Sequence, residues 1–173
     1  MQTRDQRLKY LRKTIETLWH GENSSDGDYP TIVSLLKEVI KLDPKDRDAW
    51  ENMVYLMWSI SINKKDPSWL SEAEIFAKKY LAVNPNGYRS YEYLGQFYRV
   101  MKIDYKLSLR YYESAIRWKD ALKSTHHSLI QVSLKNNDKK LALGYCKMTL
   151  ARFPKDPYTI NQLNLLTGKG VNV

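Results

Sequence analysis

The amino-acid sequence predicts an all-α protein built from stacked helical hairpins. Apolar residues recur at helical spacing along most of the chain, and glycine and proline are scarce, with 7 and 6 in 173 residues. Three similar segments end in a proline, at Pro44, Pro85 and Pro154, which are 41 and 69 residues apart. Because a proline cannot continue a helix, each of these segments closes the second helix of a hairpin.

The proline spacing predicts about four hairpins, since 69 residues is close to twice the 34 residues of a common helical repeat. The missing proline falls at Lys119. We expect repeats at 4–46, 47–86, 87–121 and 122–156, a capping helix at 157–166 and a flexible tail at 167–173. Residues 1–166 would then form a single domain.

Aspartates mark where the second helices begin. Asp66 is followed by Pro67, which places a capping side chain before a proline at the first helical position. Asp28, Asp104 and either Asn137 or Asp138 introduce the other second helices in the same manner.

The second repeat is seven residues longer than the usual 34. The surplus falls between Trp50 and Ala73 and predicts a first helix that extends to about Ile62. Apolar side chains in the added turns would lack covering neighbours, namely Met57, Trp58, Ile60, Ile62 and Trp69. Exposed apolar surface of this kind marks an assembly surface, with Trp58, Ile62 and Trp69 as its candidates. Alternatively, the two tryptophans pack on each other inside the longer hairpin.

The third repeat carries a recognisable motif. Tyr91, Leu94, Gly95 and Tyr98 follow the pattern W-x2-L-G-x2-Y with tyrosine in the tryptophan position. This repeat resembles those of the tetratricopeptide repeat (TPR) family. The i, i+3, i+7 spacing assigns Tyr91, Leu94 and Tyr98 to packing, and Gly95 fits where two helices approach too closely for a side chain.

The resemblance covers nearly the whole chain and implies a right-handed α-solenoid of about four TPR-like helix-turn-helix repeats with a C-terminal capping helix. The second helix of the third repeat places Leu107 and Tyr111 in the small and aromatic positions. The second repeat offers Trp50, Ala73 and Ala77 in the corresponding positions.

The sequence supports no catalytic chemistry. Glycine-loop and G-x-S-x-G motifs are absent, and His126 and His127 point about 100° apart on a helix, so they do not chelate a metal as a pair. Cys146 occupies an apolar position. We expect no enzyme activity, no cofactor and no metal. The N-terminus has no apolar signal segment, and no apolar stretch of the sequence is long enough to span a bilayer. We therefore expect a soluble, cytoplasmic protein.

The net charge of +9 lies in the C-terminal half. Residues 1–85 carry 13 basic and 13 acidic residues, whereas residues 86–173 carry 15 and 6. This asymmetry indicates an anionic partner for the C-terminal half, although it is also compatible with a role in solubility alone.

In TPR proteins the first helices line a concave groove that receives peptides, and the resemblance therefore implies protein–protein recognition by a scaffold or adaptor. The groove of the second to fourth repeats predicts these partner-binding residues: Tyr55, Arg89, Tyr93, Gln96, Arg99, His127, Gln131 and Lys135. The basic members favour an acidic or mixed-charge peptide. The family's clamp for peptides ending in E-E-V-D is not implied, because its polar and basic positions hold Asp48, Glu51, Ser124 and Ser128.

Two alternatives remain open. The second helices expose a basic stripe that would bind RNA or another polyanion through phosphates, formed by Lys106, Arg110, Arg117, Lys139, Lys140 and Lys147. The other is a structural subunit that oligomerises through the long hairpin or the capping helix.

Overall fold

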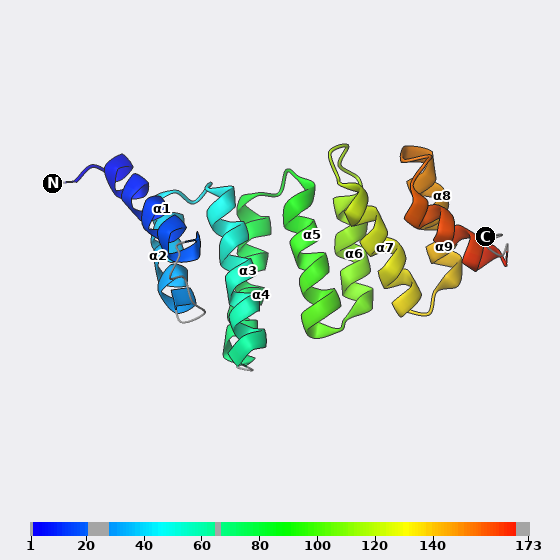
Figure 1. The fold of residues 1–173 in the computed structure, drawn as a ribbon, viewed down its shortest axis with the longest axis horizontal. Coiled ribbons are helices and arrows are strands. Elements are labelled where there is room, and N and C mark those ends of the chain that lie inside the picture. The colour runs from blue at the N-terminus through cyan, green and yellow to red at the C-terminus, as the bar shows by residue number, and fades with distance from the viewer. Residues whose placement is uncertain (1, 21–27, 65–66, 169–173) are drawn as a thin grey trace. The chain divides into compact units, whose positions relative to one another are not determined.

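The computed structural model describes residues 2–20, 28–64 and 67–168, with the side chains of 62–64 and 67 left out of account. Its helices are α1 (Arg4–His20), α2 (Tyr29–Leu42), α3 (Arg47–Lys64), α4 (Pro67–Val83), α5 (Tyr88–Phe97), the π-helical turn η2 (Tyr98–Lys102), α6 (Tyr105–Ala115), α7 (Lys123–Lys135), α8 (Lys139–Arg152) and α9 (Pro157–Thr167) (Figure 1). The described residues contain no strand, and the all-α prediction is confirmed. No helix in these ranges is long and apolar enough to cross a membrane.

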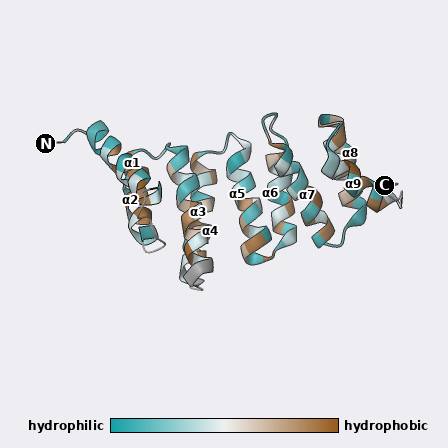
Figure 2. Ribbon diagram, viewed as in Figure 1, coloured by the Kyte–Doolittle hydropathy of each residue, from teal (hydrophilic) through white to brown (hydrophobic). Residues whose placement is uncertain are grey.

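The chain divides into two compact units: unit 1, Met1–Pro85, contains α1–α4, and unit 2, Asn86–Val173, contains α5–α9. Within each unit, every helix packs against the next one along the chain. Hydrophobic and hydrophilic residues share the same helices, as amphipathic packing requires (Figure 2). The predicted repeat boundaries remain a proposal, and residues 169–173 of the predicted tail lie outside the described residues.

The long hairpin of unit 1 covers its own extra turns. Met57 and Ile60 are 0% and 1% exposed, so the prediction that they lack covering neighbours is wrong. The reason is that α3 and α4 lengthen together, to 18 and 17 residues, and pack against each other. Trp58 and Trp69 are half-buried, and the side chain of Ile62 lies outside the described residues.

In unit 2, α5 packs closely against α6 at Gly95. A Cβ atom at Gly95 would lie 3.0 Å from two ring atoms of Tyr112 and 3.1 Å from a third. The Ser108 hydroxyl donates a hydrogen bond of 2.7 Å to the Gly95 carbonyl oxygen. A side chain at this position would make the contact tighter than is usual in proteins, which agrees with the predicted role of Gly95 in close packing.

The packing register of α6 differs by one residue from the sequence prediction. Ser108 and Tyr112 are 0% and 1% exposed, whereas Leu107 and Tyr111 are only half-buried. The π-helical turn η2 takes up one more residue than an α-helical turn, and Ile103 then reverses the chain with a φ of 53°. The predicted packing positions Leu107 and Tyr111 are therefore one residue early.

Aspartate caps begin α6 and α8 as predicted. The Leu107 N–H donates to the Asp104 carboxylate at 2.9 Å, and the Leu141 N–H donates to Asp138 at 2.8 Å. Asp28 precedes α2 but makes no side-chain capping bond, and Asp66 lies outside the described residues.

We predict that Gly95→Ala lowers the free energy of unfolding by about 1–3 kcal/mol, because its methyl group crowds the buried Tyr112 ring and forces the ring to shift. Gly144→Ala is the matched control. Gly144 lies within α8 with no atom within 4 Å of the position that a Cβ atom would take, so the higher helix propensity of alanine should stabilise the protein by up to about 1 kcal/mol. Urea unfolding of both variants measures the difference, and equal effects would contradict the close packing.

Candidate interaction surface

Pairs of polar side chains connect the first helices of unit 2. Between α5 and α7, Thr125 donates to Glu92. Arg99 Nη1, in the turn that extends α5, donates to Gln131 Oε1 at 2.9 Å. Gln131 also acts on Tyr158 of α9: burial, the larger effect, raises the pKa of the phenol overall, whereas Gln131 favours a lower pKa. We call these five residues the polar ladder. They connect α5, η2, α7 and α9 through polar side chains.

Arg99 is the cationic member of the polar ladder. Its side chain is half-buried, and its Nε is buried without a hydrogen-bond partner among the described residues. A buried donor left unpaired costs about 1–3 kcal/mol. The guanidinium therefore has donor capacity that a carboxylate can use after a rotation of the side chain, and Arg–carboxylate pairs often form two parallel bonds.

His127 has a partner within the chain, which the sequence prediction did not foresee. Its Nε2 lies 2.7 Å from Asp156 Oδ2, and its ring centroid lies 4.3 Å from that of Tyr158. Asp156 caps α9 by accepting the Thr159 N–H at 2.9 Å, and Lys123 Nζ lies 3.4 Å from its other oxygen. Burial raises the pKa of Asp156, but hydrogen bonds from Thr159 and His127 outweigh burial and lower it to about 2. His127 thus fastens α9 to α7.

The other predicted contact residues are distributed over both units. Arg89 is exposed in the first turn of α5, with its guanidinium 5.8 Å from the Tyr88 ring. Lys135 is exposed in the last turn of α7, while Tyr93 and Gln96 are half-buried on α5. Arg89 and Arg99 are ten residues apart, or about 15 Å along a helix. Unit 2 therefore brings Arg99 and Gln131 together and places Arg89 near the opposite end of the helix.

Tyr55 belongs to unit 1 and lies in an aromatic group there. It is 47% exposed, and its ring stacks on Trp19 with centroids 6.2 Å apart. Trp58 approaches Tyr55 edge-on at 6.1 Å. Glu51, which the sequence placed on the groove, is instead 8% exposed and accepts a 2.7 Å hydrogen bond from Tyr80.

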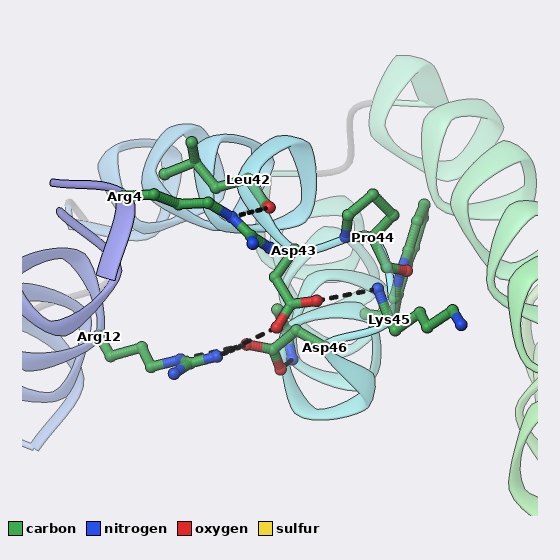
Figure 3. A network of polar contacts seen from close by, with 9 residues as sticks. Arg4, Arg12, Leu42, Asp43, Pro44, Lys45 and Asp46 are labelled. Atoms are coloured by element: carbon green, nitrogen blue, oxygen red, sulfur yellow. Dashed lines mark hydrogen bonds and ion pairs between the residues drawn. The ribbon is translucent and has the colours of Figure 1, made fainter. Parts of the chain in front are cut away.

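Ion pairs hold α1 against the turn between α2 and α3. Arg12 Nη2 lies 2.7 Å from Asp46 and 3.6 Å from Asp43, and Arg4 Nε donates to the Leu42 carbonyl oxygen at 2.9 Å (Figure 3). These contacts use the charge of Arg12 within the chain.

All six candidate polyanion-binding residues are exposed. They lie on α6, on the turn that follows it and on α8, and the structure gives none of them an ion pair among the described residues. The stripe remains a prediction.

The buried titratable groups of unit 2 are suited to packing. Cys146 is fully buried, and burial raises the pKa of its thiol. His126 is 2% exposed, and burial, followed by the charges of Arg152 and His127, lowers its pKa to about 4. No group of three or more histidine, cysteine, aspartate or glutamate residues could hold a metal within the described ranges.

Sequence reasoning missed Asp156, Tyr158 and Trp19. Asp156 precedes Pro157, which is the same capping signal that was read at Asp66 and Pro67. Tyr158 and Trp19 carry no local signal, because their roles depend on contacts with residues on other helices.

The fold defines an all-α, TPR-like solenoid. No protein-family model and no curated protein matches the sequence. Among solved structures, a MamA protein is similar with a TM-score of 0.70 and 15% identity, covering 96% of this chain and 85% of that one. TTC0263, a TPR protein of Thermus thermophilus, is similar with a TM-score of 0.62 and 13% identity, and the match covers 96% of this chain and 82% of that one. A chain in the structure of Naa15/Naa10 bound to HypK-THB is similar with a TM-score of 0.64 and 16% identity, and the match covers 94% of this chain and 23% of that one. The predicted resemblance to TPR proteins is confirmed at the level of the fold.

We predict that unit 2 loses stability as the pH falls from 6.5 toward 4. In the unfolded chain His126 takes up a proton near pH 6.5, whereas in the folded chain its pKa is about 4. The difference in the His126 pKa therefore costs no stability above pH 6.5. Below pH 6.5 the unfolded chain binds a proton that the folded chain does not, and the free energy of unfolding falls by about 1–3 kcal/mol in total. Urea unfolding across this range measures the slope. His126→Leu should flatten it, and an unchanged slope in that variant would assign the effect to other groups.

Proposed function

We propose that this protein is a non-catalytic interaction module, a scaffold or adaptor, whose unit 2 binds an acidic or mixed-charge segment of a partner protein along α5 and α7. The observation that carries the proposal is Arg99, a half-buried guanidinium with an unused donor on the polar ladder. Arg89, Lys135, Tyr93, Gln96 and Gln131 would supply the surrounding contacts.

The charge distribution supports an acidic guest. Unit 2 holds the whole excess of basic residues, and Lys135 is exposed on the helix turn that follows Gln131. Arginine binds a carboxylate in fork geometry, whereas lysine attracts it as a point charge at the rim. His127 and Tyr158 would shape the α9 end of the surface without changing its charge, since His127 already bonds to Asp156.

The structural neighbours agree with a binding role without naming a partner. One of them is a complex, Naa15/Naa10 bound to HypK-THB, so a similar fold takes part in protein–protein assembly there. Carrying that role to this chain is an argument from the fold alone.

A second candidate function rests on the exposed basic residues of α6 and α8. Their charges are not neutralised by ion pairs among the described residues, which favours a polyanion held through phosphates on these second helices. Binding of RNA that weakens steeply with salt would support this function.

We predict that Arg99→Glu weakens the binding of a fluorescently labelled glutamate-rich peptide by about tenfold or more, because it removes a charge-assisted hydrogen bond and adds repulsion. Arg110→Glu makes the same charge change on α6 and serves as the matched control. Fluorescence anisotropy with both variants separates the two surfaces.

An unchanged affinity in Arg99→Glu would remove α5 and α7 as the site. A larger loss in Arg110→Glu than in Arg99→Glu would instead favour the basic stripe on the second helices.

A further inference from the structure

Unit 1 contains a cavity between α1 and α3. Its volume is about 610 Å³, within the usual range for ligand sites. The apolar part of its lining includes Leu36 and Val39 of α2, which are 2% and 1% exposed. The walls carry the polar and aromatic residues that determine what the cavity can bind.

The charge of the cavity is acidic. Glu16 on α1 and Asp48 on α3 line it, both exposed and neither in an ion pair within the described part of the chain. The cationic side chain that the structure places in the lining, Arg12, is already matched by Asp46 and Asp43 (Figure 3). Asp48 also acts on Arg12 electrostatically, yet the described lining holds three carboxylates, Glu16, Asp46 and Asp48, against the one guanidinium of Arg12, so its charge favours a further cation.

An aromatic wall stands beside these carboxylates. Trp19 lines the cavity and is half-buried, with its ring stacked on His20 at 6.1 Å and on Tyr55 at 6.2 Å. The Trp19 ring makes interplanar angles of 26° with His20 and 18° with Tyr55. Tryptophan is the strongest cation–π partner, and a planar guanidinium stacks on an aromatic face in a way that an ammonium does not.

We propose that this cavity binds an arginine side chain presented by a partner protein, with the guanidinium against Trp19 and its charge met by Glu16 and Asp48. Charge complementarity selects the occupant: the cavity offers unpaired carboxylates and an aromatic face, and the apolar part of its lining accommodates the aliphatic stem of arginine. This site lies in unit 1 and attracts the opposite charge from the surface proposed for unit 2, so it goes beyond that function and does not depend on it.

The test is an NMR titration of the intact chain that follows the Trp19 indole N–H, assigned with a Trp19→Phe variant. The probes are the pentapeptides Gly-Gly-Arg-Gly-Gly, its citrulline analogue, which is nearly isosteric and uncharged, and Gly-Gly-Glu-Gly-Gly. We expect the arginine peptide alone to shift the signal to saturation. Because it removes both negative charges, the double variant Glu16→Gln/Asp48→Asn should weaken that binding by about tenfold or more.

Asp120→Asn, an exposed carboxylate in unit 2 without a partner among the described residues, is the control and should leave the titration unchanged. Glu16→Gln alone, which leaves the start of α3 intact, should already weaken binding.

Equal shifts from the glutamate or citrulline peptide, or undiminished arginine binding in the double variant, would overturn the proposal. So would a Trp19 signal that moves with protein concentration while light scattering shows a dimer, because a second copy would then fill the cavity. Failure here leaves the glutamate-rich peptide result for Arg99 unaffected, so the two proposals fail separately.

Discussion

The contact between Gly95 and Tyr112 is the constraint on which the account of unit 2 depends. A helical hairpin has to bury an apolar stripe on each helix, and the missing side chain at Gly95 lets α5 and α6 approach closely enough to do so. Ser108 then satisfies the Gly95 carbonyl oxygen, which the close packing removes from water. With α6 held behind it, α5 keeps its other side for α7 and for the polar ladder.

The polar ladder follows from the same packing rule. Side chains between neighbouring first helices are partly removed from water, so their polar atoms need partners. Glu92 accepts a hydrogen bond from Thr125, and Gln131 accepts one from Arg99 Nη1. Asp156 gathers Thr159, His127 and Lys123 and so joins the last helix to the unit. Most of these groups are fully used, and Arg99 is the member with a donor to spare. In unit 1 the charges are distributed the other way. Arg12 forms ion pairs, whereas Glu16 and Asp48 form none within the described residues.

Much of the fold could be predicted from the sequence, because prolines and helical periodicity are local signals. The hairpins, the capping aspartates Asp104 and Asp138 and the role of Gly95 were all accessible in this way. The register of α6 was not, because a π-helical turn depends on backbone hydrogen bonds that composition does not specify.

The candidate site was less predictable than the fold. The bond between His127 and Asp156 joins residues 29 positions apart, and the cavity beside Trp19 draws its walls from separate helices. The burial of Met57 and Ile60 likewise depends on α4 being long enough to pack along the whole of α3. The cytoplasmic location stays a prediction.

The central claim is that the first helices of unit 2 form the recognition surface and the second helices support it. Hydrogen–deuterium exchange of the intact chain, with and without a saturating glutamate-rich peptide, distinguishes the two sets of helices. We expect slower exchange in α5, η2 and α7, with α6 and α8 unchanged. Slower exchange confined to α6 and α8 would contradict the claim.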